Sequence, residues 1–278
     1  MKKAIVHMTN VFSRIFGILA AKRFPKKIQD FVNKSYIKAF NIDMSEFEVF
    51  HNYESLGALF TRSLKKPRYI AKNNQMLISM CDALVSEEGA ISHNDLNALQ
   101  IKGSSYSVNL LLGDFILTKE KKKLEGGIFV NLYLSPADYH HYHAPCDMRI
   151  IKAIHIPGKL YPVNLKWLNK KMGIFTENER VVLECETKDG SKFFLIFVGA
   201  LNVGKMRFCF DENIQTNAKD TIQTLYMYKD LHVFQGDELG FFEMGSTVVF
   251  LGENMIFKSL VKKDTKVKFG DEIIQKIA

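Results

Sequence analysis

The sequence predicts an α+β fold in which an N-terminal helical region precedes a core of mainly antiparallel strands. Helix-type periodicity extends to about Phe60, whereas short runs of Val, Ile, Leu and Phe dominate from about Met76. The chain shows no alternating strand and helix rhythm and no Gly-rich loop after a strand, which disfavours a Rossmann or P-loop enzyme. We place the boundary between residues 1–66 and residues 67–278.

The first element is a basic, amphipathic helix. The chain up to Gln29 contains no acidic residue but has seven basic ones: Lys2, Lys3, Arg14, Lys22, Arg23, Lys26 and Lys27. Apolar residues recur there at steps of three and four, at Ile5, Met8, Phe12, Ile15, Phe16 and Leu19. This pattern is typical of a helix that lies in a membrane interface, although a helix docked on the core would show it as well.

Three global features bear on location. No stretch reaches the roughly 20 apolar residues that a membrane-spanning helix needs, since Asn10 and Arg14 interrupt the best candidate. The net charge of +8 attracts nucleic acid or an anionic bilayer, and its concentration at the N-terminus favours the bilayer over nucleic acid. The four cysteines form no close pairs, which indicates a reduced protein. We therefore expect a peripheral protein on the cytoplasmic face of the cell membrane.

The β-rich part begins beyond Pro67. Five predicted strands are rich in β-branched and aromatic residues and span Ile128–Leu134, Ile150–Ile156, Arg180–Glu186, Phe193–Val198 and Thr247–Leu251. Residues 188–191 (KDGS) form a predicted hairpin turn between two of them. Residues 235–239 (QGDEL) resemble residues 269–273 (FGDEI), and we interpret both as tight turns that open strands.

Ser246 has chemical potential because Gly245 precedes it and a β-branched run follows. A serine hydroxyl beside glycine can attack the preceding carbonyl if the backbone bends, which moves the acyl group from nitrogen to oxygen. Elimination of the resulting ester leaves dehydroalanine, and its hydrolysis leaves a pyruvoyl group at the new N-terminus. On its own, however, Gly-Ser-Thr is also a common way to enter a strand.

A histidine cluster occupies residues 139–145 (YHHYHAP). A histidine can accept the Ser246 proton, and a carboxylate, for which we choose Asp82, can fix its tautomer. His141 and His143 would share one face of an extended segment and could bind a metal, but few carboxylates lie nearby, and we expect no metal. The cluster could also consist of ordinary polar loop residues.

Two motifs together resemble the signatures of the phosphatidylserine decarboxylase family: residues 135–146 (SPADYHHYHAPC) and residues 245–247 (GST). Further segments look like landmarks of the same family, and they spread the resemblance over nearly the whole chain: 60–62 (FTR), 102–107 (KGSSYS), 157–160 (PGKL), 178–181 (NERV) and 198–200 (VGA).

The resemblance implies a proenzyme that cleaves itself between Gly245 and Ser246. Asp82, His143 and Ser246 match the family's self-cleavage triad, and Ser246 would become a covalently bound pyruvoyl group. His140 matches a second active-site histidine and is the candidate proton donor. The mature enzyme would be a heterodimer of its own chains, residues 1–245 and 246–278, and could also form a homodimer.

The implied reaction converts phosphatidylserine, held in an anionic membrane, to phosphatidylethanolamine and CO2 through a Schiff base with the pyruvoyl group. Residues 80–83 (MCDA) depart from the family's usual Pro-x-Asp-Gly, and Met244 replaces its usual Leu. Glu87 and Glu88 are therefore alternative carboxylates, but the spacing from Asp82 to Gly89 matches the family. Two other functions stay open: a serine hydrolase that uses Ser246, His143 and Asp82, and a basic lipid- or nucleic-acid-binding module without catalysis.

Overall fold

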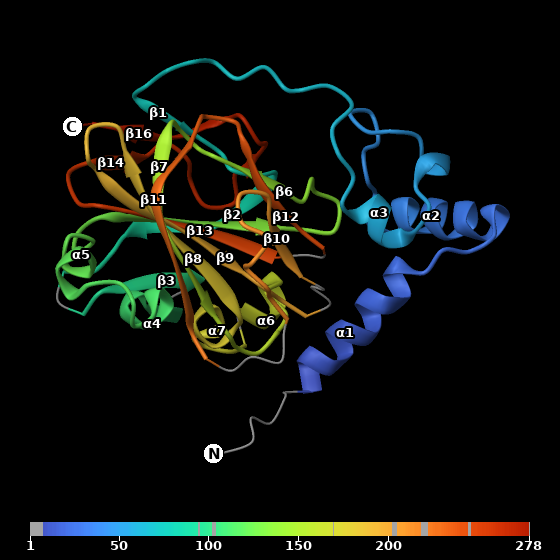
Figure 1. The fold of residues 1–278 in the computed structure, drawn as a ribbon, viewed down its shortest axis with the longest axis horizontal. Coiled ribbons are helices and arrows are strands. Elements are labelled where there is room, and N and C mark those ends of the chain that lie inside the picture. The colour runs from blue at the N-terminus through green and yellow to red at the C-terminus, as the bar shows by residue number, and fades with distance from the viewer. Residues whose placement is uncertain are drawn as a thin grey trace.

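A computed structural model describes residues 8–93, 95–101, 104–168, 170–201, 205–217, 222–243 and 246–277. Several residues singled out above lie outside these ranges: Lys2, Lys3, Ile5, Lys102, Gly103, Met244 and Gly245. The described chain has helices at its N-terminal end and a mostly antiparallel set of sheets after them (Figure 1). The predicted α+β class is confirmed.

The N-terminal helices lie to one side of the strands (Figure 1). They are α1 (Met8–Ala21), α2 (Lys26–Phe40), a 3-10 turn at Phe50–Asn52, and α3 (Leu56–Phe60). The side-chain hydroxyl of Ser55 accepts a hydrogen bond from the Ala58 N–H and thereby caps α3. Asn41 ends α2 in the left-handed conformation that asparagine tolerates at this position.

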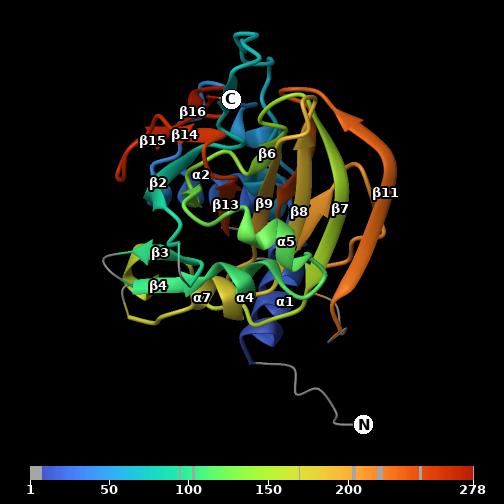
Figure 2. The same ribbon diagram turned by 90° about the vertical axis from the view of Figure 1, so that its left-hand side faces the viewer.

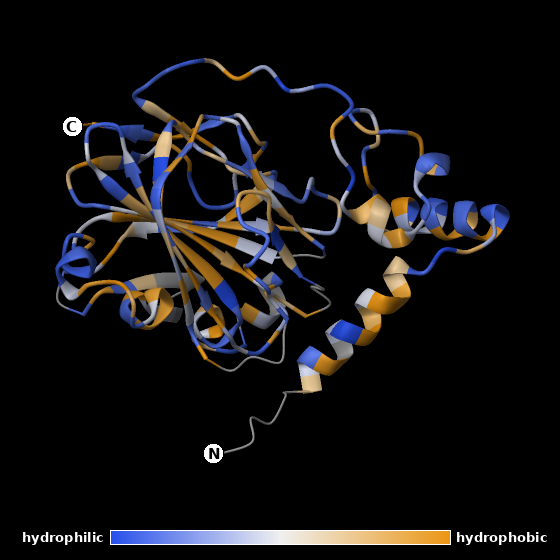
Figure 3. Ribbon diagram, in the orientation of Figure 1, coloured by the Kyte–Doolittle hydropathy of each residue, from blue (hydrophilic) through white to orange (hydrophobic). Residues whose placement is uncertain are grey.

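Both α1 and α2 bury some polar side chains and expose some apolar ones. Ser13 on α1 and Asn33 on α2 are fully buried, whereas Ile18 on α1 and Phe31 on α2 are each 72% exposed. Figure 3 shows apolar residues along the length of α1. A surface helix in water normally turns its apolar stripe toward the core. α1 therefore exposes more apolar surface than an ordinary surface helix does, whereas α2 exposes lysines as well as apolar residues.

Polar side chains hold the helices in place on their inner faces. The Asn33 amide donates to the backbone oxygens of Phe50 (3.0 Å) and Tyr53 (2.9 Å). On α1, the Asn10 amide donates to the Gly158 oxygen at 3.1 Å. These polar contacts act together with apolar packing, since the fully buried Phe60 belongs to the apolar cluster on one face of the main sheet, and Phe16 and Tyr36 pack against that cluster.

The main sheet has eight strands in the order β11-β7-β8-β9-β13-β5-β2-β15, and every pair is antiparallel. The five strands predicted from sequence are confirmed as β5, β7, β8, β9 and β13 to within two residues at each end. The strands span β2 Ala83–Ala90, β5 Ile128–Leu134, β7 Met148–Ile156, β8 Arg180–Thr187, β9 Lys192–Val198, β11 Thr224–Val233, β13 Ser246–Gly252 and β15 Lys266–Val267.

Three smaller sheets and four short helices flank the main sheet. Their order is β1-β16-β14, β10-β12-β6 and β3-β4, and in Figure 2 the last of these lies beside α4 and α7. The strands are β1 Met76–Ile78, β3 Asn97–Ile101, β4 Ser104–Ser107, β6 His141–His143, β10 Met206–Phe208, β12 Glu238–Phe242, β14 Phe257–Ser259 and β16 Glu272–Lys276. The helices are α4 Val108–Leu112, α5 Thr118–Lys122, α6 Leu165–Leu168 and α7 Ile174–Glu177.

The two similar segments are the same kind of turn, as expected. Gly236 has φ +89° and Gly270 has φ +101°, a left-handed conformation that glycine adopts without strain. Each turn places an aspartate next, and its carboxylate accepts a backbone N–H three residues back, Asp237 from Phe234 and Asp271 from Lys268. β12 and β16 start directly afterward.

The main sheet is buried on both faces, which makes β13 its most enclosed strand. Val248 and Phe250 pack into the cluster on one face, and Val249 and Leu251 pack into the cluster on the other. β13 pairs with β5 on one side and β9 on the other, so its backbone groups are satisfied within the sheet.

Candidate active site

The register of the main sheet brings Asp82 and Ser246 to the same end of β2 and β13, the two strands that flank β5. Ser246 lies opposite Leu134 on β5, and Thr247 lies opposite Tyr133, which in turn faces Leu84 on β2. Asp82 stands two residues before Leu84. Because adjacent strands lie about 4.8 Å apart, the ends of β13 and β2 are about 10 Å apart across β5.

Ser246 is fully buried, and its Oγ has no hydrogen-bond partner among the described residues. A buried hydroxyl without a partner loses the free energy of its hydration, so such groups are rare and often mark functional sites. The neighbouring Thr247 hydroxyl is in the same state. The bond between Gly245 and Ser246 itself lies outside the described residues.

His140 is a neutral, buried ring with one unbonded nitrogen. Its Nδ1 lies 2.8 Å from the Asp138 carbonyl oxygen, which can only accept, so Nδ1 carries the proton. Its Nε2 is therefore a lone-pair nitrogen, and it is buried without a partner among the described residues. Burial, and then the positive charge of Arg62, hold the pKa of His140 well below its usual range. The Phe60 ring packs against the His140 ring with the centroids 3.9 Å apart.

His143 is also a neutral ring. Its Nδ1 donates to the Gly236 carbonyl oxygen at 3.0 Å, and its Nε2 accepts from the Tyr139 hydroxyl at 3.2 Å. Its ring stacks on Phe269 with the centroids 3.7 Å apart. Burial lowers the pKa of His143 to about 4. At neutral pH this histidine is therefore in the form that accepts a proton.

The Asp82 carboxylate is held by Arg68 and by the backbone of Phe269. Arg68 donates to it through both terminal nitrogens, at 2.5 and 2.9 Å, and the Phe269 N–H donates at 2.8 Å. Arg68 also binds Glu46, whose pKa it lowers to about 2. Within the described part of the chain, no hydrogen bond joins Asp82 to His143 or either of them to Ser246. Asp82 and His143 instead meet at Phe269.

The two alternative carboxylates have other partners, since Glu87 pairs with Lys263 and Glu88 with Lys262. Ala83 is compatible with its position, because it is not among the described non-glycine residues with positive φ. The departure from Pro-x-Asp-Gly is therefore tolerated by the backbone of this chain.

Arg62 and Arg68 take part in the site, although no role was predicted for either of them from the sequence. Arg62 is buried and donates to the carbonyl oxygens of Ala137 (2.5 Å) and Asp138 (2.9 Å), three and two residues before His140. Its guanidinium also lies over the Phe47 ring at 4.5 Å. The motif at 60–62 was a signal for Arg62, but Arg68 stands in a basic segment without any pattern that distinguishes it.

An apolar cavity of about 460 Å³ lies between the N-terminal helices and this end of the sheet. Leu134, opposite Ser246, and Phe60, against His140, both line it. The helices contribute Phe16, Tyr36 and Phe40. The cavity therefore connects the neighbourhood of the candidate site with the helical region.

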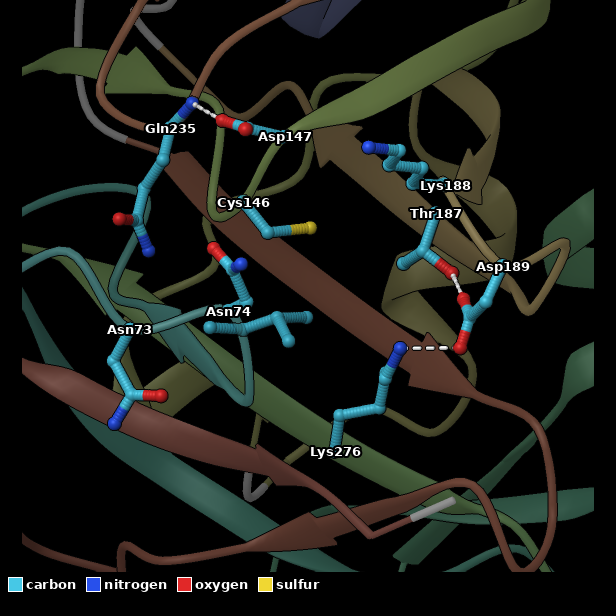
Figure 4. Close-up of a pocket in the computed structure, with 10 residues that line it drawn as sticks. Asn73, Asn74, Cys146, Asp147, Thr187, Lys188, Asp189, Gln235 and Lys276 are labelled. Carbon is cyan, nitrogen blue, oxygen red and sulfur yellow. Dashed lines mark hydrogen bonds and ion pairs between the residues drawn. The ribbon is translucent and has the colours of Figure 1, made fainter.

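A second cavity, of about 340 Å³ and lined mainly by polar residues, lies beside Cys146 and Asp147, which follow His143 in the chain (Figure 4). The Gln235 N–H donates to Asp147 at 2.9 Å, and Lys276 pairs with Asp189. Cys146 also lines this cavity, and burial raises the pKa of its thiol to about 12. None of the predicted catalytic side chains lines it.

The described residues contain no group of three or more His, Cys, Asp or Glu side chains that could hold a metal ion. His141 and His143 lie on the same strand, but each bonds to other protein groups. Among the described helices, none is long and apolar enough to cross a membrane.

Comparison with known proteins agrees with the resemblance seen in the sequence. The family model for phosphatidylserine decarboxylase matches residues 56–275. A phosphatidylserine decarboxylase proenzyme of Helicobacter pylori is 49% identical over 271 residues, which is 97% of this chain and 98% of the relative. Proenzymes of the same name are 46% identical over 264 residues in Campylobacter jejuni (94% and 97% covered) and 32% identical over 277 residues in Myxococcus xanthus (98% and 96% covered). This chain therefore belongs to the phosphatidylserine decarboxylase family.

Proposed function

We propose that this chain is a proenzyme that cleaves itself between Gly245 and Ser246 and then converts phosphatidylserine to phosphatidylethanolamine and CO2. Family membership supports the reaction. The observation that carries the mechanism is the fully buried Ser246 hydroxyl, which has no partner in the described part of the chain. It begins a strand at the end of the sheet from which Asp82 also projects.

Self-cleavage begins when a neutral imidazole accepts the Ser246 hydroxyl proton. The oxygen attacks the Gly245 carbonyl carbon, the C–N bond breaks, and an ester to Ser246 forms. Loss of the α-proton of residue 246 then expels Gly245 as a carboxylate. The dehydroalanine that is left takes up water and releases ammonia, which leaves a pyruvoyl group at the start of β13.

His143 is the proposed base for this cleavage. Its lowered pKa keeps the His143 ring neutral at neutral pH. The Tyr139 hydroxyl donates a hydrogen bond to Nε2, and this bond must break before Nε2 accepts the Ser246 proton. Asp82 supports the base through Phe269, whose N–H it accepts and whose ring stacks on His143. Arg68 fixes Asp82 in turn.

The environment of Ser246 suits a pyruvoyl group. The serine hydroxyl is a buried hydrogen-bond donor without a partner in the described part of the chain, whereas a ketone oxygen at this position has no hydrogen to donate. Once formed, the group supplies an electrophilic carbonyl that takes the substrate amine and accepts the electron pair released with CO2. His140 is the proposed proton carrier. Its unbonded Nε2 can take a proton from the substrate ammonium group and deliver one to the carbon that lost CO2.

The helical region is the proposed contact with the cytoplasmic face of the membrane. α1 and α2 expose Ile18 and Phe31, and basic residues Lys26 and Lys27 stand at the start of α2. Apolar insertion and attraction to anionic lipids would add to each other. The apolar cavity beside Leu134 then offers a place for acyl chains on the way to Ser246.

The two chains made by cleavage, 1–245 and 246–278, are expected to stay together as one folded unit. β13 pairs with β5 and β9 of the long chain on both sides, and β16 pairs with β1. A serine hydrolase acting on external esters has less support, because the matching family model is that of phosphatidylserine decarboxylase and the relatives named above are proenzymes of that enzyme.

Intact mass measurement of the purified protein tests the proposal. We expect a fragment that starts at residue 246 and has a blocked N-terminus, whereas Ser246→Ala should stay one chain and be inactive. Ser259→Ala, on β14 of the same short fragment, is the matched control and should be cleaved. Catalytically active wild-type protein with an uncut chain would overturn the proposal.

A further inference from the structure

His141 bridges two hydrogen-bond acceptors that belong to distant parts of the chain. Its Nδ1 lies 2.8 Å from Oε1 of Glu238, the first residue of β12. Its Nε2 lies 3.1 Å from the carbonyl oxygen of Thr61, directly after α3. The ring itself is 5% exposed.

Both partners of the ring are acceptors, which defines its charge. A carbonyl oxygen and a carboxylate can only accept, so each ring nitrogen must carry a hydrogen, and the ring is an imidazolium. The hydrogen bond from His141 is the largest cause that lowers the pKa of Glu238, so its carboxylate is ionised. His141 therefore differs from His140 and His143, both of which are neutral.

Aromatic rings contact the His141 ring, and titratable groups lie close to it. Tyr139 stacks on the ring with the centroids 4.9 Å apart, and Phe241 of β12 stacks at 5.2 Å. The Cys209 thiol shares the Glu238 oxygen at 3.7 Å. Burial is the main cause that lowers the pKa of His140 and His143, and a positive charge on His141 lowers both further.

Both ends of the bridge lead to proposed catalytic groups. The residues on either side of Thr61 contact the histidine segment, because Phe60 packs on His140 and Arg62 holds the Ala137 and Asp138 oxygens. At the other end, β12 runs from Glu238 to Phe242 and thus ends three residues before Gly245. The N–H of Phe242 donates to the His140 oxygen at 3.0 Å.

We propose that His141 is a positioning residue, a charged double donor that ties β12, the strand leading to the scissile bond, to the end of α3 and holds both against the neutral histidines. The inference rests on the proposed function of Ser246, His140 and His143. It gives the middle histidine a role distinct from those of its two neighbours.

Three substitutions separate the two bonds and the charge. His141→Asn places an amide nitrogen near the Nδ1 position and can keep only the bond to Glu238, whereas His141→Gln places it near Nε2 and can keep only the bond to Thr61. His141→Arg is always charged and has enough donors to serve both acceptors. His155→Asn is the matched control, because His155 binds Glu179 through Nε2 at 2.8 Å and an amide near the Nδ1 position breaks this other buried His–Glu pair, on β7.

Self-cleavage rate, fraction cleaved by intact mass, and melting temperature are measured for each variant across pH. Misplacing a reacting group by about 1 Å can cost about 100-fold, so we expect both amide variants to cleave roughly 10- to 100-fold more slowly and the Arg variant to recover most of the rate. Without the cation the pKa of His143 rises, so the acid limb of the rate profile should move to higher pH in both amide variants. His155→Asn should melt at a lower temperature but keep the wild-type limb.

Amide variants that cleave at the wild-type rate with an unshifted limb would overturn the inference, as would an Arg variant as slow as they are. Wild-type protein that neither cleaves nor decarboxylates phosphatidylserine would instead overturn the proposed function. The two failures are thus distinguishable.

Discussion

The main sheet buries its apolar side chains, whereas the helical region leaves several of its apolar side chains exposed. β13 buries all seven of its residues, with apolar side chains on both faces. α1 and α2 bury Ser13 and Asn33 and expose Ile18 and Phe31. Burial of apolar surface stabilises the sheet, because it removes that surface from water. The apolar residues exposed on the helices gain no such stabilisation in water, and we propose that a membrane covers them.

The two regions also differ in what holds them together. Continuous backbone ladders join β13 to β5 and β9. Side-chain contacts at a few positions, such as Asn10 to Gly158 and Arg62 to Ala137, attach the helices. We infer from this difference that the sheet supplies most of the stability of the fold. The helical region supplies an exposed apolar surface and holds residues beside the candidate site.

The largest effect expected from this comparison is on stability. Phe250→Ala removes a fully buried ring between Phe193 and Phe257 and should cost about 3–5 kcal/mol of unfolding free energy. Phe31→Ser, at an exposed position on α2, should change it by less than about 0.5 kcal/mol. Urea denaturation of both variants and of the wild type measures these changes in unfolding free energy. Similar losses for both would contradict the proposed division of labour.

Membrane binding should show the opposite order. Phe31→Ser removes an apolar group from the exposed face and should weaken binding to vesicles by about 1.5–3 kcal/mol. Sedimentation with vesicles of phosphatidylserine and phosphatidylcholine measures this. Tyr69→Ser, at a side chain that is 91% exposed outside the helices, is the control and should bind normally. Normal binding of the Phe31 variant would exclude this face as the contact.

The smallest effect should come from the basic residues at the start of α2. Lys26→Gln and Lys27→Gln should each weaken vesicle binding by about 1 kcal/mol when anionic lipid is present. The difference should vanish at high salt, since screening shortens the range of surface charge. Titration of binding against salt concentration checks it, and a salt-independent loss would point to an apolar role of these residues instead.

Local patterns predicted much of the fold. The five strands have the expected residue types, and the turns at 188–191, 235–239 and 269–273 need glycine at fixed places. Periodicity also predicted a helix at the N-terminus. It did not predict which face of α1 turns inward, because a stripe of apolar residues looks the same whether a core or a membrane covers it.

The candidate site could be predicted only in part. Ser246, His140, His143 and Asp82 came from motifs, that is, from short segments compared with a known family. Their surroundings depend on residues far away in the chain. Phe269 lies between Asp82 and His143, although it is 187 residues from the first of them.

The sequence by itself determined the chemical parts of this protein, namely the Gly245–Ser246 junction, the histidine cluster, and the strands that carry them. Only the tertiary structure decided the state of each part: Asp82 bound to Arg68, His141 placed between Glu238 and the Thr61 carbonyl oxygen, and His140 and His143 neutral. The physical reason is that protonation and hydrogen bonding depend on burial and on neighbours brought close by the register of the sheet. No local pattern contains that information.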